Sequence, residues 1–264
     1  MLMAGVLAGF VGALLGIGGG VLLVPLLNAT LGLSIPQAAA ISNVGVLATA
    51  GSVAVSSATR QRLNVRLAIS LLVFSVAGAT FGALLLRVLD DADYKRIFGI
   101  STAVIAALML TRLDRRNIKS AVTDTGVLGG RVFDEDTGET VAYHVIRLPL
   151  AAMVSTAAGM LATLIGIGGG IVIVPVLNSL CGVPMRVAAA TSAFMIGVTT
   201  VPAAIARWRL GHLGDFHLAA GVALGALAGY QLGVWMSGRA PVRALKMLMA
   251  AILSVVAARY LLWA

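Results

Sequence analysis

Charge is scarce in this sequence, and acidic charge is the scarcest. Only 11% of the 264 residues are charged, with ten acidic residues against nineteen lysines and arginines. Hydrophobic residues make up 59% of the chain and the mean hydropathy is +1.01, far from the balance of a soluble globular domain. The composition therefore excludes a soluble fold and indicates an integral membrane protein.

The sequence also lacks the groups on which several functions depend. Its single cysteine, Cys181, excludes an internal disulfide and predicts an inert, apolar thiol. Outside a polar segment at 113–147, the acidic residues all lie at the boundaries of apolar segments: Asp90, Asp91, Asp93 and Asp215. Cation-coupled transporters usually keep a carboxylate inside a span, so cation transport is disfavoured. No span holds an acid–base pair, a metal cluster or an activated nucleophile, so no enzyme, metal or cofactor is expected.

Eight apolar segments approach or exceed the roughly 20 residues that span a bilayer. They cover residues 2–31, 36–59, 67–86, 97–111, 148–182, 187–206, 216–238 and 247–263. Because they lack the alternation of barrel strands, they predict an all-α integral membrane protein of about eight helical segments. The first has no basic region before it and no convincing cleavage site, which favours a membrane segment over a signal peptide.

An internal repeat organises the chain. Residues 16–28 (GIGGGVLLVPLLN) and 166–178 (GIGGGIVIVPVLN) are identical at nine of thirteen positions. The offset of 150 residues continues without a gap through Ala38–Ala40 and Ser42, which match Ala188–Ala190 and Ser192. Two homologous four-segment repeats, at 1–112 and 148–264, are therefore expected, a plan that many secondary transporters share.

The polar segment 113–147 separates the repeats and holds six of the ten acidic residues. Arg131–Phe133 and Val141–Val145 flank a polar stretch, which predicts a small β-hairpin outside the membrane. Basic residues gather at the ends of apolar segments, a distribution typical of membrane topology rather than of nucleic-acid binding. It places 113–147 in the cytoplasm of a multi-pass membrane protein.

The first segment of each repeat is expected to break at its GIGGG motif. A straight helix over 2–31 would be about 45 Å long, well beyond a 30 Å hydrocarbon core. The glycines permit positive φ, and Pro25 removes a helical hydrogen bond. A broken helix leaves free amide groups at the start of its second half, where the helix dipole attracts anions. Two such breaks could converge on one site.

Other glycines fit a packing role. Gly5/Gly9, Gly12/Gly16, Gly78/Gly82 and Gly225/Gly229/Gly233 have the small-xxx-small spacing of close helix–helix contacts. The alternative of a nucleotide-binding loop is rejected, because GIGGG lacks the following Gly-Lys-Ser/Thr and the strand that would precede it.

Neutral donors are the candidates for lining an anion path, because hydroxyls and amides can bind an oxyanion without a buried charge. They are Asn28, Ser42, Asn43, Thr49, Asn178, Thr191, Ser192, Thr199, Thr200 and Gln231. Each alone also fits a helix–helix hydrogen bond. Asn43 has Ala193 as its repeat partner, which departs from internal symmetry.

Basic groups are candidates for an entrance or for coupling. Arg60, Arg62, Arg207 and Arg209 could form a basic mouth that concentrates anions, although topology-setting charge explains them better. His212 and His217 titrate near neutrality and are the candidates for any proton coupling.

The two glycine motifs, the Val-Pro-x-Leu-Asn that follows each, the Ala-Ala-Ala-x-Ser segments and the basic turns together resemble the sulfite exporter TauE/SafE family. The resemblance covers nearly the whole chain. It implies a permease for sulfur-containing anions such as sulfite or organosulfonates. It also implies that substrate binds at the glycine segments, which here are Gly16, Gly18, Gly19, Gly20, Gly166, Gly168, Gly169 and Gly170.

The sequence thus predicts a transporter that partners a small anion and the lipid bilayer, not nucleic acid, with homo-oligomerisation possible. A transporter or channel for another solute, and a non-transporting scaffold or assembly factor, stay as alternatives. Lysines and arginines divide twelve to seven in favour of the linker side if all eight segments cross. They divide thirteen to six if the first segment of each repeat is a re-entrant hairpin. Eight crossings make the repeats parallel and re-entrant hairpins make them inverted; we slightly favour eight crossings.

Overall fold

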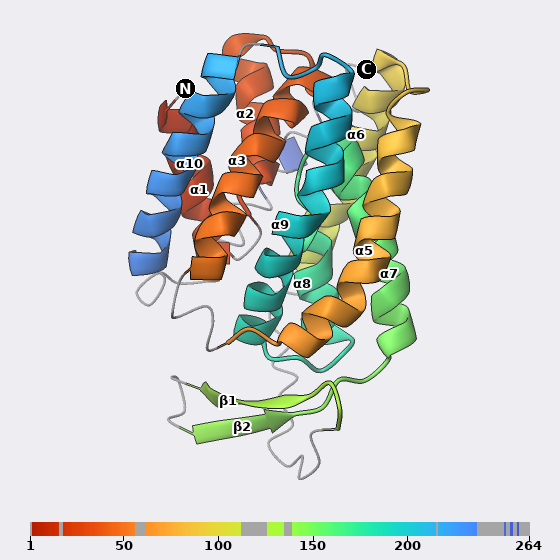
Figure 1. Ribbon diagram of the computed structural model, residues 1–264, viewed down its shortest axis with the longest axis vertical. Helices are drawn as coiled ribbons and strands as arrows, with labels where there is room; N and C mark the ends of the chain where they lie inside the picture. Colours follow the sequence, from red (N-terminus) through yellow and green to blue (C-terminus); the bar gives the residue numbers. More distant parts are fainter. Residues whose placement is uncertain are drawn as a thin grey trace.

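The computed structural model describes residues 2–15, 18–55, 62–111, 126–134, 139–214 and 216–236, together with 251, 254, 255 and 258. Within these ranges the chain is mostly helical (Figure 1). The first half contains α1 (Leu2–Leu15), α2 (Gly20–Leu31), α3 (Ile35–Val55), α5 (Val65–Leu85) and α6 (Asp91–Thr111). The second half contains α7 (Leu148–Ile165), α8 (Gly170–Ser179), α9 (Met185–Arg209) and α10 (Phe216–Met236). The expected eighth apolar segment, 247–263, lies almost wholly outside the described residues.

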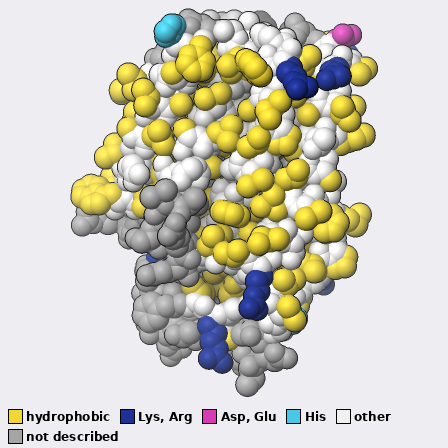
Figure 2. Space-filling view, viewed as in Figure 1, with side chains coloured by type: hydrophobic (Ala, Val, Ile, Leu, Met, Phe, Trp, Pro, Cys, Tyr) yellow, Lys and Arg dark blue, Asp and Glu magenta, His cyan; other side chains and the backbone are white. Residues whose placement is uncertain are grey.

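Four helices in the described part of the chain are long and apolar enough to cross a bilayer: α5, α7, α9 and α10. Large apolar side chains cover their outward faces, among them Phe81, Met153 and Leu224, which are more than half exposed. Figure 2 shows one such face, with hydrophobic side chains over its middle and basic side chains near its two ends. This distribution matches a bilayer's apolar core and polar surfaces, so the chain is a membrane protein.

The first segment of each half is a helix hairpin and does not continue straight across. Gly19, just before α2, packs against Ala8 in the middle of α1, since a Cβ on Gly19 would lie 2.5 Å from the Ala8 carbonyl oxygen. Gly169, just before α8, lies in the same way beside Ala158 and Ala162 of α7. Because the chain doubles back in both halves, the structure has the re-entrant arrangement rather than the eight straight crossings favoured above.

The two halves point in opposite directions. The amino-terminal end of α1 lies at one end of the molecule, and α7 begins at the other end, beside the β-hairpin (Figure 1). The first helix of each half packs against a helix of the other half: α1 packs along α10, and α7 packs along α5. The two halves of the described chain are therefore oppositely oriented, an arrangement found in many transporters built from duplicated units.

Glycines bring these paired helices together, as their spacing predicts. A Cβ on Gly229 of α10 would collide with the Val6 carbonyl oxygen of α1, and one on Gly159 of α7 would collide with the Ser75 carbonyl oxygen of α5. Gly5, Gly9, Gly78, Gly82, Gly225 and Gly233 are equally close to a facing backbone. The packing role predicted for these glycine pairs is confirmed.

A two-stranded hairpin extends from one end of the helical part, within the polar segment where the sequence predicts one. β1 (Gly130–Asp134) pairs antiparallel with β2 (Glu139–Tyr143). Asn64, the N-cap of α5, donates from Nδ2 to the Tyr143 hydroxyl at 2.9 Å and to the Leu128 carbonyl oxygen at 2.7 Å. Burial raises the pKa of the Tyr143 hydroxyl, so this anchoring group stays neutral.

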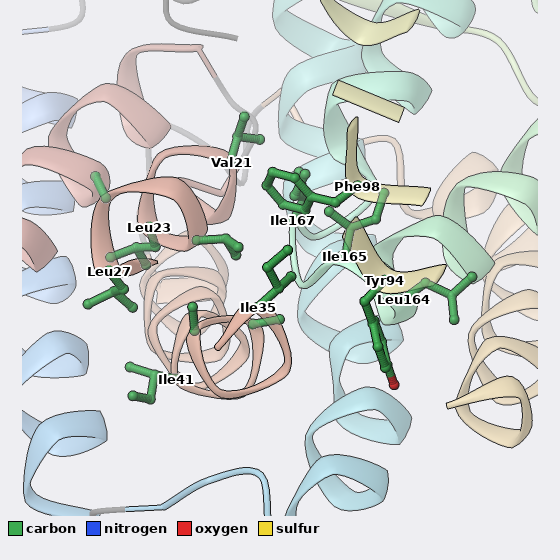
Figure 3. Close-up of a cluster of buried hydrophobic side chains, with 14 of the residues drawn as sticks. Val21, Leu23, Leu27, Ile35, Ile41, Tyr94, Phe98, Leu164, Ile165 and Ile167 are labelled. Carbon is green, nitrogen blue, oxygen red and sulfur yellow. The ribbon is translucent and has the colours of Figure 1, made fainter. Parts of the chain in front are cut away.

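A buried apolar cluster lies where the halves meet. Figure 3 shows Ile165 and Ile167, on either side of Gly166, next to Phe98 of α6, with Val21 of α2 nearby. Ile35 and Ile41 of α3 and Leu164 of α7 belong to the same cluster. The tip of the second hairpin is thus held in apolar surroundings contributed by the first half of the chain.

Candidate functional site

The two glycine segments lie together at the centre of the molecule. A Cβ on Gly20 would be 2.8 Å from the Gly166 carbonyl oxygen and 3.0 Å from that of Ile167. Five glycines in these segments have positive φ: Gly18, Gly19, Gly166, Gly168 and Gly169, at 56° to 84°. L-residues rarely adopt this backbone, so glycine is required for the chain to turn back here. Gly16 lies outside the described residues.

Ser42 of α3 joins the two segments. Its hydroxyl donates to the Gly166 carbonyl oxygen at 2.8 Å and lies 3.3 Å from the Gly20 carbonyl oxygen. The Ser42 side chain is fully buried, and Ala39, one turn earlier, packs directly against Gly166. A predicted donor of the first repeat therefore contacts the break of the second repeat.

Two branched apolar side chains fill the space between the breaks. Val46 of α3 and Ile196 of α9 are repeat partners at the 150-residue offset. A Cβ on Gly168 would lie 3.2 Å from Val46 Cγ1 and 3.1 Å from Ile196 Cγ2, and one on Gly18 would be 3.6 Å and 3.5 Å from the same two side chains. Both side chains are at most 1% exposed. They form an apolar plug at the point where α2 and α8 begin.

Asn43 and Ser192 are buried polar side chains without a partner. Asn43 follows Ser42 on α3, and neither its Oδ1 nor its Nδ2 forms a hydrogen bond within the described structure. Ser192 Oγ is likewise unpaired there, and it lies 3.0 Å from the position of a Cβ on Gly170. Both residues are fully buried. Unsatisfied buried groups are rare in proteins, which makes these two the strongest of the predicted ligand donors.

The other predicted donors bind the protein's own backbone. Asn28 and Asn178 donate to the carbonyl oxygens of Leu33 and Val183, at 2.7 Å and 3.0 Å. They close the turns after α2 and α8, at the helix ends remote from the breaks. This shared structural role explains why both copies of the motif end in asparagine, and no bound ligand is needed to explain it.

The predicted threonine donors form hydrogen bonds within the protein, and Gln231 lies on the surface. The Thr191 hydroxyl accepts a hydrogen bond from the Asn64 backbone N–H at 3.2 Å. Thr199 and Thr200 donate to main-chain oxygens within α9, and Thr49 donates to the Val46 carbonyl oxygen at 2.9 Å. Gln231 is exposed on α10, so it does not face the breaks.

The basic candidates divide into surface and interior groups. Arg209 and His217 are exposed, and Arg62 and His212 are half-buried at helix ends, whereas Arg60 lies outside the described residues. Arg207 is different, because its side chain is 0% exposed. The expectation that it belongs to a basic mouth therefore needs correction. Its guanidinium reaches inward, and its partners lie on α3 and α7.

The charges in the interior of the described structure come from helix ends and from one buried side chain. The starts of α2 and α8 carry the partial positive charge of the helix dipole, and each has a glycine N-cap without a capping side chain. No carboxylate is among the buried polar residues of the described chain. Arg207 is the one charged residue among them.

Comparison with known proteins identifies the family of this chain. The chain matches the family described as "Sulfite exporter TauE/SafE" over residues 1–260. This chain belongs to the TauE/SafE family. Family membership makes it a membrane transporter.

A curated relative supports the same assignment for the TauE/SafE chain. The sequence is 26% identical over 263 residues to "Probable membrane transporter protein YunE" of Bacillus subtilis (strain 168), covering 97% of this chain and 94% of that protein. No solved structure matches the chain.

Val46 and Ile196 were missed as site residues from the sequence, because apolar residues in an apolar span carry no signal of their own. The internal repeat could have identified these two positions. They occupy corresponding positions four residues after Ser42 and Ser192, on the helix face that contacts the breaks.

Proposed function

We propose that this TauE/SafE protein is a permease for a small sulfur-containing oxyanion, such as sulfite or an organosulfonate, in a bacterial inner membrane. The end of the molecule that carries the β1–β2 hairpin faces the cytoplasm. This orientation is consistent with the thirteen-to-six division of basic residues for re-entrant first segments. Access alternates as one repeat moves against the other. The meeting of two inverted glycine breaks at the centre is the observation that carries the proposal.

The anion is held by neutral donors next to the helix starts. Free amides at the beginning of α2 and α8 provide backbone donors, and the dipoles of both helices favour negative charge. The unpaired Asn43 amide and Ser192 hydroxyl are the side-chain donors we assign to the site, since a ligand would satisfy both. The plug of Val46 and Ile196 closes the path when no anion is bound.

The direct test is flux of sulfite across proteoliposomes that contain the purified protein. We expect sulfite to move faster than in protein-free liposomes, and thiosulfate or sulfoacetate to compete better than acetate. Preference for acetate would indicate a different anion. An absence of flux for every anion would contradict the proposal and favour a scaffold.

Asn43→Leu separates a ligand role from a structural role. A buried, unsatisfied amide destabilises a fold by about 1–3 kcal/mol. Leucine keeps the branching at Cγ and removes this cost, but it is larger, so the gain is offset by overpacking and thermal stability should change little. Transport should fall about tenfold or more, because the ligand loses a hydrogen bond. Ala193, the apolar repeat partner, shows that the corresponding helix position accepts a side chain without donors. Full transport in Asn43→Leu would exclude Asn43 from the site.

A further inference from the structure

Arg207 lies in the protein interior, and no countercharge is found beside it among the residues that the structure describes. It is fully buried near the end of α9, and none of the described carboxylates forms an ion pair with it. Burial of an isolated charge is unfavourable unless hydrogen bonds and an opposite charge compensate for it. The groups around the guanidinium therefore indicate whether its charge has a structural role or a binding role.

Three neutral carbonyl oxygens bind the guanidinium. Nη1 donates to Pro36 at the start of α3 at 3.0 Å, and Nη2 donates to Thr163 and Leu164 in the last turn of α7 at 2.9 Å each. The carboxyl end of a helix carries only a partial negative charge, about half an elementary charge. These contacts satisfy donors but leave the cation incompletely neutralised.

Two of the five donors of the guanidinium remain unused among the described residues, the second N–H of Nη1 and the Nε–H. Nε–H is buried and has no acceptor among the described residues. A guanidinium presents its donors in a rigid planar fork, which suits the oxygens of an oxyanion.

Arg207 is also placed at the second glycine break. Its partners Thr163 and Leu164 directly precede the segment that turns at Gly166, whose carbonyl oxygen binds Ser42. Leu164 and Tyr94 lie side by side in the apolar cluster at this end of α7 (Figure 3). The cation therefore sits in low-dielectric surroundings, where an anion is attracted strongly.

We propose that Arg207 is the cationic group of the anion site at the second break, with Nε–H as its donor to a small oxyanion. This inference rests on the proposed function and adds a charged group on the α7 side of the second break. A simple cap for the carboxyl end of α7 is the competing role.

The test compares Arg207→Gln with Arg66→Gln, the same change at an exposed arginine near the start of α5 that has no role in the site. Detergent-purified proteins are heated with sodium sulfite or with sodium chloride at equal ionic strength, and sulfite flux is measured in proteoliposomes. We expect sulfite to stabilise the natural protein and Arg66→Gln but not Arg207→Gln. The KM for sulfite of Arg207→Gln should rise about tenfold or more.

A cap alone gives a different pattern. It lowers the unfolding temperature of Arg207→Gln but preserves the sulfite-induced shift and the KM, and that result would overturn the proposal. If Arg207→Gln cannot be purified in folded form, the KM of Arg207→Lys distinguishes the two roles. Its ammonium still donates to the α7 carbonyls, so an unchanged KM supports a cap and overturns the proposal, while a raised KM supports the anion site. Absence of sulfite flux in the natural protein would instead contradict the proposed function.

Discussion

At the scale of single residues, the centre of the protein is built from residues that differ from their neighbours in one property each. Gly168 has a left-handed backbone. Within the described part of the chain, the Asn43 amide has no hydrogen-bond partner and the Arg207 charge has no counterion. Each property is unfavourable in a folded chain taken alone. Their concentration around two breaks is typical of a functional site, where stability is lowered for binding.

Ile196→Ala is expected to make the plug leak. Truncating this buried side chain opens space beside Gly18 and Gly168 and destabilises the fold by about 2–5 kcal/mol. Passive sulfite release from loaded proteoliposomes should accelerate. Leu71→Ala, a comparable truncation of a fully buried side chain on α5, should lower stability without accelerating release. Equal leakage from the two variants would argue against a plug at Ile196.

Residue roles could be predicted from the sequence only where the repeat and backbone chemistry agree. The glycines marked the turns, and the 150-residue offset paired Ser42 with Ser192. The burial of Arg207 could not be foreseen, because its acceptors at Pro36, Thr163 and Leu164 are 43 to 171 residues away in sequence. From the sequence alone, a basic residue at the end of an apolar run looks like a topology signal.

At the scale of helices, close approach depends on glycine at fixed positions. The α1–α10 and α5–α7 pairs both bring a backbone carbonyl oxygen against a glycine Cα. The same two interfaces hold the hairpin of each repeat to the other repeat. Stability and inter-repeat motion are therefore governed by the same surfaces.

Gly229→Ala and Gly159→Ala should each destabilise the protein. The added methyl group would overlap the Val6 or Ser75 carbonyl oxygen, and such overpacking typically lowers stability by about 1–3 kcal/mol. Gly51→Ala is the control, because nothing lies within 4 Å of its Cβ position in α3. That control should be neutral or slightly stabilising, since alanine favours helices. The midpoint of thermal unfolding in detergent measures all three, and a neutral Gly229→Ala would refute the close approach.

Helix existence was readable from the sequence, but helix direction after each break was not. An apolar run of 30 residues has the same composition whether it continues or turns back. Contacts between Gly19 and Ala8, and between Gly169 and Ala158, distinguish the two cases. These are tertiary contacts that periodicity does not encode.

At the scale of the whole molecule, the re-entrant arrangement fixes which loops share a side of the membrane. His144, before α7, and Arg186, at the start of α9, lie on the same side if α7 and α8 form a hairpin. Eight straight crossings would place them on opposite sides.

Cysteine labelling can test this in a Cys181→Ser background. His144→Cys and Arg186→Cys should react with an impermeant maleimide only in inside-out vesicles, and Val88→Cys, after α5, only in right-side-out cells. Val88 is 79% exposed, so it serves as the accessible reporter of the other side. Labelling of positions 144 and 186 from opposite sides would restore the eight-crossing topology.

The inverted arrangement of the two halves means that a single set of coordinates contains a template for a second state. Under the proposed alternating access, the second state is the one in which the two halves have exchanged their conformations. Positions with identical partners, such as Gly18 and Gly168, look the same from both compartments after that exchange. Asn43 and Ala193 do not, so a solute meets a different chemical environment on its way in than on its way out.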